Sequence, residues 1–149
     1  MLVIGTTATP AQAAFGGVCA NNSICLYQWT GLGAQVAGNR WQSSFSNIIY
    51  NHNGCLNLAG ATWANGTLVN DNSGSLMYVV TGGYSNYAIR IYDWVNCNFS
   101  GPSRNIGYAA DNTTYAMDNL NDYLFSNNNP TGKSPYHNIT SIGISDPLG

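Results

Sequence analysis

One six-residue pattern occurs twice in this 149-residue chain, at 24–29 and again at 89–94. It consists of isoleucine, any residue, leucine or isoleucine, tyrosine, glutamine or aspartate, and tryptophan. β-Branched and aromatic residues dominate both copies and favour strands. At nearly the same distance after each copy lies another strand candidate, 75–80 in the first case and 141–145 in the second. Because two landmarks recur in register, the sequence predicts an internal duplication.

Composition and length indicate what the duplicated segment builds. Charged residues make up 7% of the chain and Glu is absent, whereas Asn and Gly are abundant. The strong helix formers are therefore scarce, and the common polar residues favour turns. We expect an all-β chain that forms one domain over residues 14–149, with repeat halves at about 19–80 and 87–145.

The charge balance excludes two classes of partner. The formal net charge is -2, and no two of the four basic residues are adjacent. Nucleic acids and anionic membrane surfaces both need clustered Lys and Arg, so we expect neither nucleic acid nor a membrane as partner. Nothing approaches the roughly 20 consecutive apolar residues of a membrane span.

The first residues predict export. Residues 1–8 are mostly small and apolar, and residues 11–13 form an Ala-x-Ala cleavage site. No basic residue precedes Arg40, so the basic start of a signal peptide is missing; a start codon placed too late would explain this. We expect residues 1–13 to be a signal-peptide remnant and the protein to be secreted. A disordered tail rich in Ala and Thr is the alternative.

Export agrees with the cysteine content. Four cysteines, Cys19, Cys25, Cys55 and Cys97, allow two disulfide bonds in three pairings. The chain has no Cys-x-x-Cys motif and its two histidines lie far apart, so the spacing does not fit zinc. We expect all four cysteines to be bridged.

Several segments resemble a known family. Residues 91–93 and 98–101 resemble the opening strand and folded hairpin of a βγ-crystallin Greek key, in which a glycine, here Gly101, takes a conformation closed to residues with a Cβ. Residues 70–75 resemble the segment that closes such a motif, and 136–141 keep its last two positions. In the first half, Cys19 and the Cys-Leu-Tyr segment that follows resemble secreted bacterial peptidase inhibitors of βγ-crystallin-like fold.

The resemblance has consequences for fold and covalent structure. It implies two tandem Greek-key motifs that form a βγ-crystallin-like sandwich, here with long polar loop insertions at 51–65 and 109–136. It also implies the pairing of Cys19 with Cys25, which leaves Cys55 with Cys97. The closing segments end in Ser75 and Ser141, and the structural alternative to calcium binding there is that these serines cap the folded hairpins through backbone hydrogen bonds.

The resemblance also implies a candidate calcium site. It would place ligands at Asn70, Asp71, Asn72 and Thr140. Gly74 lacks the hydroxyl expected at its position, and carboxylates are few for an ion that takes six to eight oxygens. Any such site would be weak, so we expect that the fold requires no cofactor. The alternative, which we favour, is that Asn70 and Asp71 form a turn.

The aromatic residues, ten Tyr and four Trp, raise a carbohydrate-binding alternative, because exposed rings can stack on sugars. Trp29 and Trp94 occupy equivalent repeat positions, so we expect both to pack in the core or between the halves. Trp41 and Trp63 lie in less regular segments and are the candidates for an exposed contact.

The residue types that catalysis needs are scarce. The chain has no Glu, six scattered Asp, and two histidines, His52 and His137, that stand in no nucleophile-elbow or related context. Bridged cysteines would leave no thiol as a nucleophile. We therefore expect no enzymatic activity.

These observations favour a secreted protein-binding module, most concretely a peptidase inhibitor. Its partner would be another secreted protein, either a protease or a subunit of an assembly. One alternative is a structural or adaptor subunit of a secreted assembly such as a toxin complex. A second alternative is a weak Ca²⁺- or glycan-binding βγ-crystallin-like protein.

Overall fold

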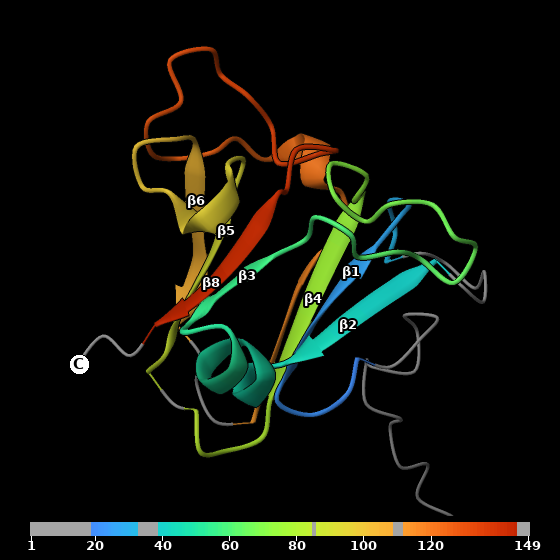
Figure 1. The fold of residues 1–149 in the computed structure, drawn as a ribbon, viewed down its shortest axis with the longest axis vertical. Coiled ribbons are helices and arrows are strands. Elements are labelled where there is room, and N and C mark those ends of the chain that lie inside the picture. The colour runs from blue at the N-terminus through green and yellow to red at the C-terminus, as the bar shows by residue number, and fades with distance from the viewer. Residues whose placement is uncertain (1–18, 33–38, 85, 109–111, 146–149) are drawn as a thin grey trace, which may run out of the picture.

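The computed structural model describes residues 19–32, 39–84, 86–108 and 112–145, so the predicted export segment lies outside the described residues. Two four-stranded antiparallel sheets pack face to face (Figure 1). The strands are β1 (Ser23–Tyr27), β2 (Arg40–Ser44), β3 (Cys55–Asn57), β4 (Ser75–Val80), β5 (Ala88–Tyr92), β6 (Ser103–Tyr108), β7 (Thr113–Met117) and β8 (Ser141–Ser145). Three short helical turns join them: η2 (Asn47–Asn51), η3 (Val95–Cys97) and η4 (Leu120–Asp122). None of the described helices is long and apolar enough to cross a membrane.

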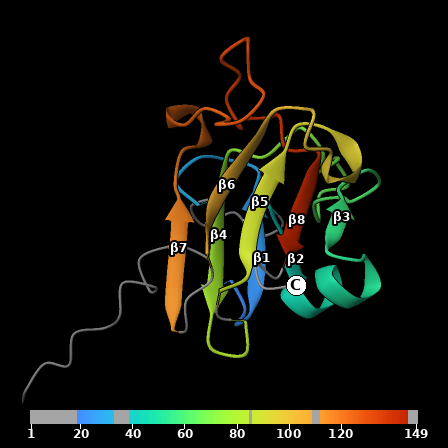
Figure 2. The same cartoon turned by 90° about the vertical axis from the view of Figure 1, so that its left-hand side faces the viewer.

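The two sheets have the same strand order when β1–β4 are matched with β5–β8. The first sheet runs β2-β1-β4-β7 and the second runs β6-β5-β8-β3 (Figure 2). Each half therefore gives one strand, β3 or β7, to the sheet of the other half. Register agrees as well: Cys25 pairs with Met77 across β1 and β4, and Arg90 pairs with Gly143 across β5 and β8. The repeat in the sequence thus corresponds to a repeat of strand order and of residue register. Because the halves exchange a strand, they form one interlocked unit.

Alternate strand residues point into the space between the sheets, as the two-residue period of a strand requires. Each fully buried aliphatic side chain there contributes roughly 1.5–3 kcal/mol relative to exposure. The strand residues of this core include Ile24, Leu26, Leu76, Tyr78, Val80, Ile89, Ile91, Ile142 and Ile144. The four strands that contribute them, β1, β4, β5 and β8, are the central strands of the two sheets.

The disulfide bonds are Cys19–Cys25 and Cys55–Cys97, which confirms the expected pairing. The first closes a small loop that leads into β1. The second joins β3 to η3 and therefore connects a strand of the first half to a loop of the second. Such bonds form in oxidising compartments and are typical of extracellular proteins.

The tryptophans depart from expectation. Trp29 and Trp94 are 53% and 47% exposed, because β1 and β5 end two residues earlier and the chain turns away from the sheets. Trp63 is 1% exposed and lies in the main core, so it does not offer the surface contact expected of it. Trp41 is half-buried on the edge strand β2, where it packs against the same core.

Candidate functional site

One loop of the second half combines exposed apolar side chains with a rigid backbone. Residues 93–101, called the 93–101 loop below, connect β5 to the segment before β6 and contain η3. Trp94, Val95 and Phe99 are 47%, 48% and 62% exposed. Asp93 is the only charged residue of the loop. Apolar side chains on one exposed loop are typical of a surface that contacts another protein.

Ser141, the first residue of β8, is hydrogen-bonded to the backbone of the loop at two points. Its hydroxyl donates a hydrogen bond to the carbonyl of Trp94 at 2.6 Å and accepts one from the backbone N–H of Cys97 at 3.1 Å. Ser75 makes the equivalent bond in the first half, to the carbonyl of Trp29, also at 2.6 Å. Both serines are fully buried, so each bond satisfies polar groups that water does not reach. The two serines thus make backbone hydrogen bonds at equivalent places in the two halves.

Further bonds hold the middle and the end of the loop. The side chain of Asn57 on β3 bonds to Asn96 twice, at 2.6 Å to its backbone N–H and at 2.7 Å to its side chain. The backbone N–H of Asp93 donates to the carbonyl of Pro102 at 2.9 Å, which closes the base of the loop. With the Cys55–Cys97 bond between these two points, the backbone has little freedom to rearrange.

Gly101 is required for a different reason from the one expected. Its φ does not lie in the left-handed region. A Cβ at this position would instead overlap the indole ring of Trp94. The ring therefore lies directly against the glycine backbone, which fixes the orientation of this exposed side chain.

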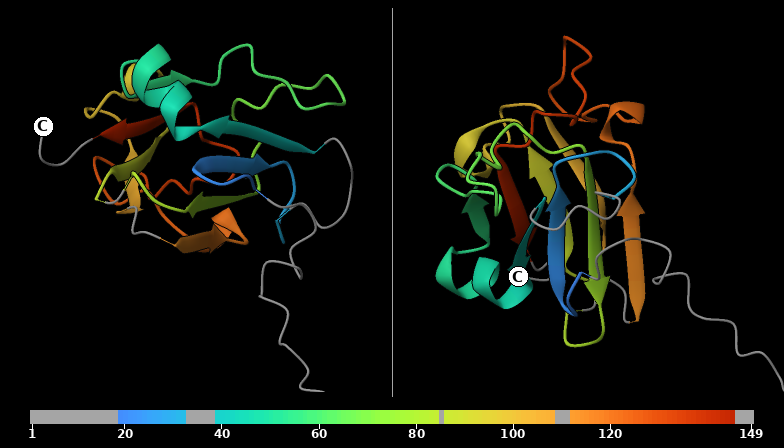
Figure 3. Two further views of the ribbon diagram at one scale, coloured as in Figure 1. Left: turned by 90° about the horizontal axis from the view of Figure 1, so that it is seen from below. Right: turned by 90° about the vertical axis from the view of Figure 1, so that its right-hand side faces the viewer.

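The loop borders a hollow of about 660 Å³ on the side of Trp94. Opposite Trp94 lies the segment 128–133, which rises above the same end of the sandwich (Figure 3). Lys133 Nζ contacts both carboxylate oxygens of Asp93 at 2.8 and 2.9 Å, and the Asn128 side chain donates to the carbonyl of Phe99. These bonds tie the long insertion of the second half to the 93–101 loop.

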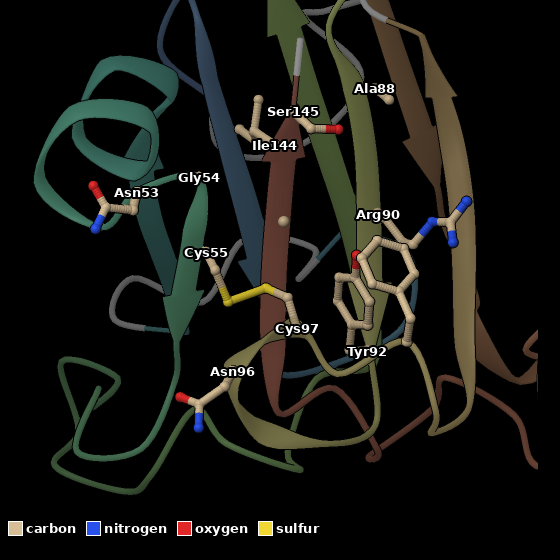
Figure 4. Close-up of a pocket in the computed structure, with 12 residues that line it drawn as sticks. Asn53, Gly54, Cys55, Ala88, Arg90, Tyr92, Asn96, Cys97, Ile144 and Ser145 are labelled. Carbon is tan, nitrogen blue, oxygen red and sulfur yellow. A yellow bond between two sulfur atoms is a disulfide. The ribbon is translucent and has the colours of Figure 1, made fainter. Parts of the chain in front are cut away.

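A second hollow, about 440 Å³, lies on the outer face of the second sheet and is also bordered by the loop. Figure 4 shows the Cys55–Cys97 bond on one side, Arg90 on the other, and Tyr92 between them. The Arg90 guanidinium lies 5.0 Å from the centre of the Phe99 ring, and Phe99 meets Tyr92 edge to face. Burial raises the pKa of Tyr92, and the positive charge of Arg90 opposes the rise.

The candidate calcium residues form a clasp between the two halves. Asp71 accepts hydrogen bonds from Thr140 and from the Asn70 side chain, each at 2.9 Å. The backbone N–H of Asp71 donates to the carbonyl of Ile139 at 3.2 Å. Both carboxylate oxygens thus have protein partners, and Asp71 takes a left-handed conformation typical of a turn.

Asn72 does not join that clasp, because its side chain donates to the carbonyl of Leu68 at 3.2 Å. The equivalent turn of the second half has His137 in place of Asp71, and its backbone N–H donates to the carbonyl of Ser73 at 3.0 Å. Of the four candidate ligands, the structure therefore brings three together. Within the described residues, no three His, Cys, Asp or Glu side chains are grouped so that they could hold a metal.

The two histidines lie apart and in different surroundings. His52 is exposed at the end of η2, and the His137 ring stacks on Tyr136 with 4.0 Å between ring centres. All four cysteines are bridged. In the part of the chain that the structure describes, we find no paired acid, base and nucleophile from which a catalytic site could be built.

The fold and this site define an all-β protein of two four-stranded antiparallel sheets with two disulfide bonds. Its 93–101 loop presents apolar side chains at the surface on a backbone held by hydrogen bonds and a disulfide bond. Its disulfide bonds indicate an oxidising, extracellular environment. Comparison with protein-family models, with curated proteins and with solved structures gives no match for this chain.

Sequence reasoning did not single out the 93–101 loop as a contact surface. It treated Trp94 as a packing residue and Phe99 only as part of a hairpin. One signal was present: Val95 and Phe99 flank Cys97 at two residues on either side, and each is separated from it by an asparagine. An apolar residue on each side of a disulfide cysteine is a pattern that a stapled, exposed loop would give.

Proposed function

We propose that this protein is a secreted protein-binding module that uses the 93–101 loop to inhibit a peptidase. The architecture in this proposal is a pair of Greek-key motifs related to those of βγ-crystallins. Its support is the strand order, in which each half returns its fourth strand beside its first and exchanges its third with the other half. The fold alone does not determine the function, so the argument depends on the loop.

One observation carries the proposal: the exposed apolar side chains of the 93–101 loop stand on a backbone that is already fixed. Phe99 and Val95 are about half to two-thirds exposed, while the disulfide at Cys97 and the Ser141 bonds hold the backbone beneath them. Binding then costs little ordering entropy, which is the main benefit of preorganisation. A loop that does not rearrange can occupy a peptidase cleft and resist cleavage.

The proposal includes the absence of catalysis. The described histidines are separated, the cysteines are bridged and the Asp93 carboxylate is paired with Lys133. General acid–base chemistry needs a titratable group poised beside a partner, and the site offers none. The 93–101 loop can make apolar contacts, and the amide side chains at its edge can form hydrogen bonds.

The test is an inhibition assay against purified secreted serine and metallopeptidases. The measured quantity is the rate at which each peptidase cleaves casein with and without the protein. We expect stoichiometric inhibition of at least one peptidase, with the 93–101 loop intact after prolonged incubation. Specific capture of a secreted protein without any inhibition would instead favour the adaptor role. Hydrolytic turnover by the protein itself, lost on His52→Ala or His137→Ala, would overturn a binding role altogether.

A further inference from the structure

The two sheets differ at one equivalent position on their outer faces. Met77 is the central outward residue of β4, and Gly143 is its counterpart on β8. Met77 is buried in a small second core beneath Leu32 and the Cys19–Cys25 bond. Gly143 has no side chain, and the hollow of about 440 Å³ lies over it. In the part of the chain that the structure describes, side chains thus cover one outer face and leave the equivalent place on the other face open.

Of the described residues that line this hollow, Arg90 alone is charged. It occupies the strand position next to Gly143. Among the described residues, the guanidinium forms no hydrogen bond or ion pair and contacts the face of Phe99. By contrast, Arg104 donates to the carbonyl of Leu124 at 2.7 Å and Lys133 pairs with Asp93.

A guanidinium that lies over an aromatic ring keeps its N–H edge available. That edge matches a carboxylate in a planar, two-bond geometry. A phosphate or sulfate group usually needs more than one cation, and this hollow has one. The charge and its geometry therefore fit a single carboxylate.

The walls of the hollow are apolar. Tyr92, Phe99 and the Cys55–Cys97 bond form much of its surface, and Asn53 and Asn96 stand at the rim. We propose that this hollow binds a carboxylate of the partner protein together with the apolar group that precedes or follows it, Arg90 pairing with the carboxylate. The identity of the occupant as part of a partner rests on the proposed function, whereas the carboxylate preference of the hollow can be measured without the partner.

The experiment titrates the isotope-labelled full chain with short peptides, followed by amide and Arg side-chain NMR. One pair of probes is acetyl-Phe-Glu-Phe-amide and its Gln counterpart, which differ only in the carboxylate. A second pair, acetyl-Ala-Phe with a free or an amidated C-terminus, distinguishes a terminal carboxylate from a side chain. We expect the preferred acidic probe to bind at least fivefold more tightly than its neutral counterpart, with the largest shifts at Arg90 and Phe99.

Variants locate the effect. Arg90→Gln should abolish the preference for the acidic probe, and Arg90→Lys should retain only part of it because the two-bond fork is lost. The matched control is Arg104→Gln, which removes the same charge from the neighbouring strand β6 at a position that faces the other side of the sheet. That variant should keep the full preference.

Two results would overturn the proposal: equal affinity for acidic and neutral probes, or an equal effect of Arg90→Gln and Arg104→Gln. If the protein inhibits a peptidase but shows no acidic preference, this proposal fails alone. If the preference is found but no partner depends on the loop, the proposed function fails alone.

Discussion

Ser141 and Trp94 are joined by a 2.6 Å hydrogen bond that crosses from β8 to the exposed loop of the same half. Ser75 and Trp29 form the same bond in the first half, where the disulfide-linked cysteines lie outside the corresponding loop. The two serines therefore have matched structural roles, but only one lies beneath the candidate contact surface. Comparing variants of the two serines therefore separates the effect of stability on binding from the effect of loop geometry on binding.

Replacing either serine with alanine should weaken folding, and Ser141→Ala should do so more because it also leaves the backbone N–H of Cys97 without its partner. Each change leaves a backbone carbonyl without its buried partner, which costs roughly 1–3 kcal/mol of unfolding free energy. Urea unfolding of Ser75→Ala and Ser141→Ala measures this cost. Only Ser141→Ala should also weaken inhibition, because only it releases the 93–101 loop. Similar losses of inhibition in both variants would indicate that stability alone sets the affinity.

The Cys55–Cys97 bond should contribute to both stability and binding. In the chain-entropy model, a bond that closes a loop of this length contributes about 4 kcal/mol. The double variant Cys55→Ala with Cys97→Ala should therefore unfold at lower denaturant and bind more weakly than the wild type. Cys19→Ala with Cys25→Ala is the control, because it removes a bond far from the 93–101 loop and should leave inhibition unchanged in the folded protein. Unchanged inhibition without the Cys55–Cys97 bond would argue against a preorganised loop.

Buried tyrosines predict a loss of stability in strong base. Burial raises the pKa of Tyr78 to about 12, with a further contribution from the neighbouring Tyr115. An unfolded chain loses the same proton near pH 10. Because the folded protein holds the proton more tightly, the contribution of Tyr78 is fully present below pH 10 and is lost as the pH rises towards 12. Melting curves from pH 8 to 12 should show this decline, and Tyr78→Phe should make it shallower; an identical decline in that variant would refute the assignment.

Calcium should not be needed for folding. Asp71 supplies the single carboxylate of the clasp, and both of its oxygens already accept hydrogen bonds. At millimolar Ca²⁺, a weak site would raise the melting temperature by only a few degrees. Scanning calorimetry with EDTA and with calcium measures the difference. A rise of more than about 10 °C would require a tighter site than these residues provide.

The strands that sequence patterns predict well are the ones buried in the middle of each sheet. β4 and β8 match the expected ranges of 75–80 and 141–145, because both contain β-branched residues and are bounded by turn residues. None of the edge strands β2, β3, β6 and β7 was expected, since an edge strand can be polar and carries little alternation. The expectation of loop insertions at 51–65 and 109–136 is wrong in part, because β3 and β7 lie within these two segments. The apolar run at 47–50 belongs to the helical turn η2, which illustrates that a short apolar run does not distinguish helix from strand.

The candidate site was less predictable than the fold. Exposure of Trp94 depends on where β5 ends, and the end of an element is the least reliable part of any sequence-based assignment. The hollow over Gly143 depends on which distant segments pack against the outer face of β8, and local sequence carries no signal for that. By contrast, the roles of Ser75 and Ser141 could be inferred, because a buried serine in a recurring motif has few bonding options.

The measurement that bears most directly on the account is inhibition by a loop variant beside a matched surface variant. Val95→Ser with Phe99→Ser removes two exposed apolar side chains from the 93–101 loop. Tyr50→Ser with Leu68→Ser removes two that are 72% and 54% exposed elsewhere on the molecule. If the loop is the contact surface, the first pair should weaken binding by about a hundredfold, as expected when two central anchors are lost, and the second pair should leave it within twofold. Equal binding by the two double variants would contradict the account.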